Sequence, residues 1–224
     1  MRDSRMEVTS DIAALVERLH AKPAVLVQGS AIGVYGVEPG AVTEDSWIAV
    51  DGSFSQQLCL DWEREAARIG IPRHVVLRIG VVLDRAGGAL GQMLVPTEFA
   101  GGTRLGSGTQ RLSWISRDDL VRTVLHALDT PSLHGAVNAV TGVARNRAFT
   151  NALARALHRP AWLATPAWLL RRFGVGREIL LADQAVRRVR SGPTPLDPNL
   201  ARFLDTHLAR RQPLRRAKGV RAHA

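Results

Sequence analysis

Apolar and polar positions along this chain follow two distinct periods. In EVTSDIAALVERLHAK, residues 7–22, the apolar side chains recur every three or four positions, at Val8, Ile12, Leu15, Val16 and Leu19. That spacing places them on one face of a helix. The next segment, PAVLVQGS at residues 23–30, is a short apolar run that ends near a glycine, which is typical of a parallel strand buried on both faces. The pattern therefore predicts a helix followed by a buried strand.

The same two patterns continue to about residue 190. The helix that starts after Ser116 is the best signalled, because Ser116 can cap it and Asp118 and Asp119 lie in its first turn, where the helix dipole favours anions. The further predicted strands are HVVLRIGVVL (74–83), LSWI (112–115) and GAVNAVT (135–141), and the further predicted helices are 55–70, about 90–99, 116–131, 146–160, 165–174 and 176–190.

Apolar strands that alternate with amphipathic helices indicate a parallel sheet covered by helices on both faces. With right-handed crossovers, this order predicts an α/β fold: a partial Rossmann-like, doubly wound parallel sheet with a small C-terminal substrate lobe. We expect residues 1–158 to form the C-terminal part of the Rossmann-like domain, with a substrate-lobe segment at about 84–113. Residues 159–184 are expected to form a helical C-terminal substrate lobe, and residues 185–224 a basic, poorly ordered tail.

Charge changes this picture only at the C-terminus. The formal net charge is +10, and ten basic but only two acidic residues lie between Ala185 and Ala224. A basic tail can attract nucleic acid by releasing counterions, but the tail has no repeated aromatic–basic interleaving that would suggest a base-stacking surface. We therefore expect a solvated tail and no nucleic-acid partner. A frameshifted or divergent ending would also produce this Arg/Pro-rich composition.

Cysteine content and hydropathy bear on location. Cys59 is the only cysteine, so an internal disulfide is impossible and a reducing compartment is favoured. The N-terminal residues MRDSRMEVTSD have no apolar core typical of a signal peptide, and no apolar run approaches the roughly 20 residues that span a bilayer. We expect a cytoplasmic protein without a membrane partner. The seven histidines show no metal-ligand spacing, so no metal site is expected.

Five segments carry a resemblance to a known family. They are LVQGSAIGVYG (26–36), VVLRIGVVLDRAGGALGQML (75–94), LGSGTQRLSWISRDDLV (105–121), GAVNAVT (135–141) and NRAFTNALARALHRPAW (146–162). Together they resemble the atypical extended short-chain dehydrogenase/reductases. More narrowly, they resemble the NAD-dependent epimerase/dehydratase-like group often labelled nucleoside-diphosphate-sugar epimerase. The resemblance covers about residues 5–184 and implies NAD or NADP as cofactor.

The resemblance also shows what the sequence lacks. Members of the family begin with a strand and a G-x-x-G-x-x-G turn, whose backbone approaches the cofactor pyrophosphate beside a helix N-terminus. No such turn is present. GGALGQML and GGTRLGSG are glycine-rich, but neither follows a strand and opens a helix in the required way, so we interpret both as substrate-lobe loops. The chain is therefore expected to be an N-terminally truncated member.

The catalytic pair of the wider superfamily is a tyrosine with a lysine four residues later, which moves a proton while hydride moves to or from nicotinamide. The lysine matters because a phenol with an unperturbed pKa of about 10 is a poor base at neutral pH. The resemblance puts these positions on Ser53 and Gln57, which cannot do this chemistry. The only two lysines, Lys22 and Lys218, lie far away in the sequence. Catalysis is therefore expected to be impaired.

The remaining catalytic candidates follow the first predicted strand. Ser30 is the best candidate to hydrogen-bond a substrate carbonyl or hydroxyl. The usual serine position of the wider superfamily falls on Ala31, one residue later, and Ser30 can equally satisfy local backbone. Tyr35 is the only tyrosine. It either points into the cleft or has a structural role in the loop.

The resemblance assigns further binding residues at two places. In similar proteins, backbone at the position of Ile79, Gly80, Val81 and Val82 lies against nicotinamide, and a glycine permits close approach. Gln110, Arg111 and Trp114 resemble the segment that lines the substrate site of sugar-nucleotide enzymes, where an arginine can grip a diphosphate with two hydrogen bonds. The alternative is a surface arginine and a core tryptophan.

The expected function is NAD(P)-dependent epimerase/dehydratase-like chemistry on a hydroxyl or carbonyl of a small-molecule substrate, with a nucleotide sugar as one class. The alternative is a non-catalytic binding or scaffold protein that associates, for example as a homodimer, through the sheet edge left without a neighbouring strand.

Overall fold

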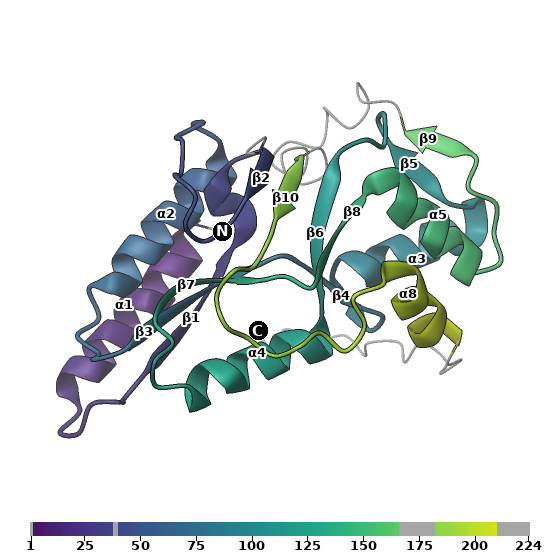
Figure 1. The fold of residues 1–224 in the computed structure, drawn as a ribbon. Coiled ribbons are helices and arrows are strands. Elements are labelled where there is room, and N and C mark those ends of the chain that lie inside the picture. Colours follow the sequence, from purple (N-terminus) through teal and green to yellow (C-terminus); the bar gives the residue numbers. More distant parts are fainter. Residues whose placement is uncertain (1, 38–39, 166–181, 210–224) are drawn as a thin grey trace, which may run out of the picture.

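The structure is a computed structural model that describes residues 2–37, 40–165 and 182–209. Figure 1 shows two groups of elements side by side, one around β1, β3 and β7 and one around β4, β6 and β8. The elements are α1 (Arg2–Arg18), β1 (Leu26–Ala31), η1 (Ile32–Tyr35), β2 (Gly40–Val42), α2 (Phe54–Ala67), β3 (His74–Ile79), β4 (Val81–Asp84), α3 (Gly88–Ala100), β5 (Thr103–Leu105), β6 (Arg111–Ser116), α4 (Arg117–Asp129), β7 (Gly135–Ala139), β8 (Gly142–Arg145), α5 (Asn146–Ala156), β9 (Leu163–Thr165), β10 (Gln184–Val186) and α8 (Leu200–Ala209).

The main sheet is parallel and has the strand order β1-β3-β7. Alternate side chains of β3 point to opposite faces. Val75 and Leu77 pack in one hydrophobic cluster with Ala127 of α4, whereas Arg78 reaches Glu63 of α2 on the other face. Helices therefore cover both faces (Figure 1), which confirms the predicted α/β class with a parallel sheet.

The helices on the α2 face begin with α1. Its predicted apolar face packs only partly: Val16 is buried with Ala66 and Ile69, whereas Val8 and Leu15 are each 57% exposed. On the side away from β3, β1 pairs with no other strand of the described chain. The predicted helix and strand are present, and the edge of β1 is open.

The run 74–83, predicted as one strand, is two strands divided at Gly80. β3 ends at Ile79, and β4 continues in a second sheet of order β4-β6-β8. A Cβ on Gly80 would lie 2.8 Å from the carbonyl oxygen of Ser113. The glycine therefore lets the chain pass close to β6 as it moves from one sheet to the other.

The second sheet packs with α3, α5 and α8 around one hydrophobic core. Trp114, Phe149 and Phe203 are its largest buried members, and leucines such as Leu153 and Leu204 pack with them. Predicted helices at about 90–99, 116–131 and 146–160 correspond to α3, α4 and α5. Ser116 caps α4 as predicted, because its Oγ accepts a hydrogen bond from the Asp119 backbone N–H.

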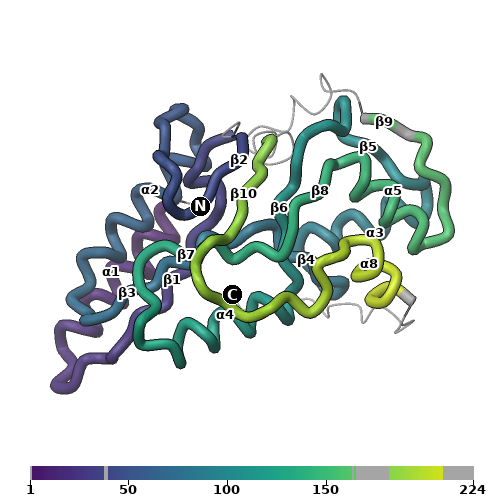
Figure 2. The backbone as a smooth tube through the Cα atoms, viewed as in Figure 1, coloured from purple at the N-terminus to yellow at the C-terminus, as the bar shows by residue number. Residues whose placement is uncertain are grey.

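The C-terminal segment differs from two expectations. Residues 184–186 were predicted to lie in a helix but form β10, which pairs in parallel with β2 and passes beside β6 (Figure 2). A poorly ordered tail from residue 185 is also wrong for its described part: α8 packs on α5, and Phe203 and Leu204 are buried. The tail is folded here because its sequence, although rich in arginine, also contains apolar side chains that pack in the core. The predicted helix 165–174 lies outside the described residues from position 166 onward, as does the tail beyond 209.

Hydropathy of the helices gives one further finding. Over residues 2–37, 40–165 and 182–209, none of the helices combines the length and the apolar character needed to cross a membrane.

Candidate functional site

A cavity of about 270 Å³ lies where the two groups of elements meet. Its floor is formed by residues at the carboxyl ends of two parallel strands: Ala31–Gly33 at the end of β1 and Ile79–Val81 at the end of β3. We call this cavity the strand-end cleft. In open α/β sheets, ligands bind outside the carboxyl ends of the strands, so its position alone marks it as the candidate site.

The walls of the strand-end cleft come from segments far apart in the sequence. α2 supplies one wall, β6 a second, and the segment before and at the start of β10 a third. The wall residues are Ser55, Leu58, Cys59 and Trp62 of α2, Arg111, Leu112 and Ser113 of β6, and Ala182 and Gln184, with Arg5 and Val37 at the margins. The lining is mainly apolar with a few polar groups, as is usual for small-molecule sites.

Three of the four residues predicted to face nicotinamide line this cleft: Ile79, Gly80 and Val81. Val82 does not, since it packs against the hydrophobic cluster beneath α4. Gly80 was interpreted as allowing a cofactor to approach closely. The close neighbour in the structure is instead the backbone of Ser113, with Val140 Cγ1 3.0 Å from the position of a Cβ.

Arg111 also lines the cleft, but its guanidinium already has a partner. Its Nε and Nη2 donate to the two carboxylate oxygens of Asp183 at 2.7 and 2.8 Å, and its backbone N–H donates to Asp183 Oδ1 at 2.6 Å. These hydrogen bonds hold the pKa of Asp183 below its ordinary value and raise the pKa of Arg111. The two guanidinium donors that were expected to bind a diphosphate therefore bind the Asp183 carboxylate instead.

The other two predicted substrate residues lie elsewhere. Trp114 is only 1% exposed and packs against Phe203 at 5.4 Å between ring centroids. It is a core residue and cannot contact a substrate, so that assignment is corrected. Gln110 lines a smaller apolar cavity of about 100 Å³ in the second group, and its Nε2 donates to the carbonyl of Leu105.

Ser30 and Tyr35 are both buried in a polar network on the α2 face of the sheet. Ser30 Oγ donates to Glu63 Oε1 at 2.7 Å, and Arg78 joins Glu63 through Nε and Nη2. Tyr35 donates to Asn138 Oδ1 at 2.8 Å and accepts from Arg78 Nη1 at 3.1 Å. Neither side chain is among the residues that line the strand-end cleft.

The electrostatics of this network argue against Tyr35 as a base. Burial raises the pKa of Tyr35, and this outweighs the opposing influence of Arg78. The phenol therefore stays protonated at neutral pH. Of the two interpretations left open by the sequence, the buried geometry favours the structural one.

The positions assigned to the tyrosine and lysine pair have structural partners at the start of α2. Ser53 is the N-cap, and its Oγ accepts a hydrogen bond from the Gln56 backbone N–H. Gln57 Nε2 donates to Asp61 Oδ1 at 2.8 Å. Neither residue carries an acid or base that can titrate near neutral pH.

Sequence reasoning missed several residues of the cleft. Gln184 donates to the carbonyls of Ile32 and Gly36 and so holds the loop after β1, and Ser113 Oγ bonds backbone on both sides of Ala185. The only sequence feature that pointed to these residues was the polar pair Asp183–Gln184 within an apolar run. This run was predicted to form a helix. Cys59 is buried but also lines the cleft, and burial raises its pKa.

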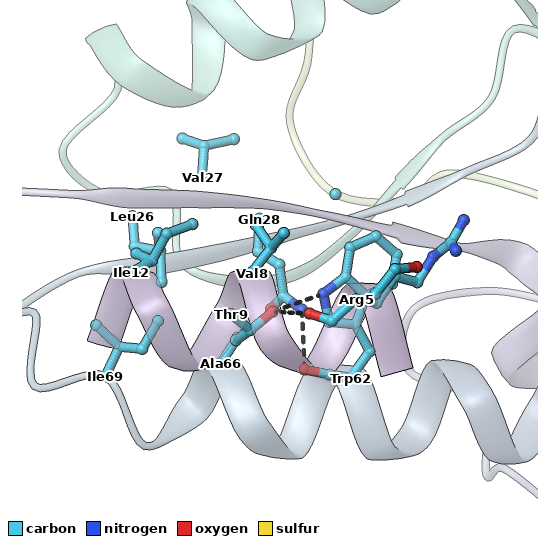
Figure 3. A pocket seen from close by; sticks show the side chains of 12 residues that line it. Arg5, Val8, Thr9, Ile12, Leu26, Val27, Gln28, Trp62, Ala66 and Ile69 are labelled. Atoms are coloured by element: carbon cyan, nitrogen blue, oxygen red, sulfur yellow. Dashed lines mark hydrogen bonds between the residues drawn. The ribbon is translucent and has the colours of Figure 1, made fainter. Parts of the chain in front are cut away.

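A larger cavity, of about 350 Å³, lies between α1, α2 and the open edge of β1. Figure 3 shows its side chains: Val8, Ile12, Leu26 and Ile69 are apolar, and the hydrogen bonds there link Trp62 to Thr9 and Gln28. The lining holds one charged residue, Arg5, and no acid or base. Within the described residues, no group of three or more His, Cys, Asp or Glu side chains could hold a metal ion.

Comparison with known proteins identifies the family. No protein-family model matches the chain. The epimerase family protein Mb2239 of Mycobacterium bovis is 42% identical over 176 residues, which are 76% of this chain and 57% of that protein. The chain spans little more than half the length of the curated relatives it matches first.

Two solved structures are also similar. The human epimerase family protein SDR39U1 (isoform 2), solved with NADPH, is 32% identical with a TM-score of 0.86, over 93% of this chain and 73% of that one. A nucleoside-diphosphate sugar epimerase from Corynebacterium glutamicum is 25% identical with a TM-score of 0.58, over 93% of this chain and 49% of that one. The chain therefore belongs to the SDR39U1-like epimerase family, an atypical group of NAD-dependent epimerase-like short-chain dehydrogenase/reductases.

Proposed function

We propose that the strand-end cleft receives the nicotinamide end of NAD or NADP. The observation that carries the proposal is the cleft's position at the carboxyl ends of β1 and β3, with Ile79–Val81 in its lining. Ile32, Ile79 and Leu112 offer apolar surface that suits a planar ring. The NADPH in the human relative's structure supports the same ligand class. When bound, the cofactor would supply or accept a hydride.

The substrate class we propose is a small molecule with a hydroxyl or carbonyl, and a nucleotide sugar in particular. Support comes from the Corynebacterium glutamicum relative, a nucleoside-diphosphate sugar epimerase. Gln110 and Arg111 remain the proposed substrate residues, with Arg111 exchanging Asp183 for a diphosphate when the substrate binds. A reducing compartment suits the free thiol of Cys59, so we place this function in the cytoplasm.

We further propose that turnover by this chain is impaired. Ser53 and Gln57 serve as a helix cap and as the partner of Asp61, so the proton transfer that must accompany hydride movement lacks a base at that place. The sequence also lacks a G-x-x-G-x-x-G turn for the pyrophosphate. The chain is then expected to bind the cofactor weakly and to turn over slowly or not at all.

The test is a titration of the full chain with NADPH and NADH, followed by nicotinamide fluorescence. We expect saturable binding by the wild type and loss of binding by Ala182→Trp, which places a large ring in the cleft wall. Arg155→Gln, at an ion pair on the surface of α5, is the control and should bind as the wild type does. Absence of saturation by a folded, monodisperse chain overturns the proposal.

A homodimer that pairs through β1 is the second candidate function. It is favoured by the open edge of β1 together with the exposed Val8, Ile12 and Leu15 on the neighbouring helix. A second copy suits this surface because two-fold pairing of identical edge strands satisfies the same backbone groups on both sides.

Light scattering after gel filtration tests the dimer. The wild type should have twice the mass of the chain, and Val8→Glu with Leu15→Glu should give a monomer. Val121→Glu, at an exposed apolar position on α4, is the control and should stay dimeric. A wild-type monomer at all concentrations tested removes this candidate.

A further inference from the structure

A polar cavity of about 210 Å³ lies away from the strand-end cleft. It is lined by Arg104, Arg147, Thr150, Asn151, Ala161 and Trp162, none of which lines the cleft or the smaller apolar cavity. Arg104 and Leu105 are neighbours on β5 and so point to opposite faces of the strand. Leu105 faces the apolar cavity, and Arg104 faces this one.

No described residue compensates the charge in this cavity. Its lining contains two arginines and no aspartate or glutamate. Among the described residues, neither Arg104 nor Arg147 forms an ion pair. Arg147 Nη2 makes a single long contact, 3.5 Å, to the carbonyl of Ser107. By contrast, Arg78 donates two hydrogen bonds to the Glu63 carboxylate, and Arg111 donates two to the Asp183 carboxylate.

Hydrogen-bonding capacity is also unused. Arg104 Nε and Thr150 Oγ1 are buried and have no hydrogen-bond partner within residues 2–37, 40–165 and 182–209, and Thr150 is only 4% exposed. A buried donor without a partner is destabilising relative to a satisfied one. Such groups in a native structure call for a ligand or an ordered water. Both residues line the same cavity, so one ligand can relieve both costs.

The backbone brings the two arginines together at Gly108. With φ +71, Gly108 adopts a left-handed conformation that favours glycine, and a Cβ there would lie 2.6 Å from Arg104 Cγ and Cδ and 3.2 Å from Arg147 Cβ. The Arg147 backbone N–H donates to the Gly108 carbonyl at 2.9 Å. The stem of Arg104 therefore lies over Gly108, next to the base of Arg147.

We propose that this cavity binds a phosphate group, either as a free anion or as part of a phosphorylated small molecule. Guanidinium groups bind phosphate oxygens with charge-assisted, often paired hydrogen bonds. Asn151 adds an amide donor. Trp162, 76% exposed at the margin of the cavity, presents an aromatic face to whatever the phosphate carries. The site does not depend on the proposed cofactor function of the cleft.

Calorimetric titration of the full chain with three probes tests the site: inorganic phosphate, inorganic pyrophosphate and glucose 1-phosphate. Saturable binding of at least one probe is expected. Arg104→Gln and Arg147→Gln should each weaken it about tenfold or more, since each removes a charge-assisted hydrogen bond. Tighter binding of the sugar phosphate than of the free anions would identify an ester as the ligand, and the reverse order would identify a free anion.

One control keeps the result specific. Arg155→Gln removes the same charge from α5, the helix that carries Arg147, at a site paired with Asp205 and should bind the probes like the wild type. The proposal is overturned if no probe binds saturably, or if the double variant Arg104→Gln, Arg147→Gln binds as well as the wild type. NADPH titration of the double variant reports separately on the cleft.

Discussion

Arg111 on β6 and Asp183, the residue before β10, form a two-point ion pair with both N–O distances under 3 Å. The two residues are 72 positions apart in the sequence. Arg111 lines the strand-end cleft, and Ala182 and Gln184, on either side of Asp183, line it too. The pair therefore fixes the C-terminal wall of the cleft against the second sheet.

The first prediction concerns the pH dependence of this pair. The folded-state pKa of Asp183 is lowered by Arg111, so its stabilisation is fully present above the unfolded pKa of about 3.9 and is lost as the pH falls through the folded pKa. Asp183→Asn should lower the free energy of unfolding at pH 7 by about 1 kcal/mol or less, because the pair is solvent-screened. Urea unfolding measured from pH 7 to 3 should show that the difference in free energy of unfolding between wild type and Asp183→Asn becomes smaller as the pH falls. A difference that grows at low pH contradicts this account.

Tyr35→Phe separates a structural from a catalytic role. The change leaves Asn138 Oδ1 and Arg78 Nη1 without a buried partner, so the free energy of unfolding should fall by about 1–3 kcal/mol. NADPH affinity should not change. Normal stability combined with altered cofactor affinity would show that Tyr35 acts in the cleft instead.

Gly80→Ala tests the crossing between the two sheets. The added methyl group would lie 2.8 Å from the Ser113 carbonyl oxygen and 3.0 Å from Val140 Cγ1, and overpacking of this kind costs about 1–3 kcal/mol. Gly87→Ala is the control, since a Cβ there meets nothing within 4 Å. Thermal unfolding of the two variants should separate them clearly, and equal melting temperatures would contradict the close approach.

Phe203→Ala tests whether α8 is part of the folded core. Phe203 is 2% exposed and packs against Trp114, and removal of a buried phenylalanine side chain costs about 3–5 kcal/mol. Arg202→Ala, at the exposed residue next to Phe203, should lower the free energy of unfolding far less. A tail that contributed nothing to the fold would leave both variants as stable as the wild type.

Local pattern predicted those elements whose residues lie close together in sequence. The helix after Ser116 could be placed because its cap and first turn are adjacent. β1, β3 and β7 could be recognised because they lie in short, mainly apolar runs, as strands buried on both faces do. β10 could not be recognised, since Gln184–Val186 becomes a strand only by pairing with Gly40–Val42. The division at Gly80 was hidden for the same reason: it depends on contact with Ser113.

The candidate site was predicted in part. Ile79, Gly80, Val81 and Arg111 do line the strand-end cleft, and their functional roles remain predictions. Ser30 could not be assigned from sequence because its partner, Glu63, is 33 positions away. Residues after a strand can be located by pattern, but whether a side chain faces a cleft or a buried partner depends on tertiary contacts.

The most direct test of the cofactor cleft uses Cys59, the only cysteine, as a reporter on its wall. The measurement is the rate of thiol alkylation at mildly alkaline pH, because burial raises the pKa of this thiol, with increasing NADPH. NADPH in the cleft should slow alkylation saturably, with the same midpoint as the fluorescence titration, and Ala182→Trp should abolish this protection. An alkylation rate that stays constant while NADPH fluorescence saturates would place the cofactor elsewhere and contradict the account.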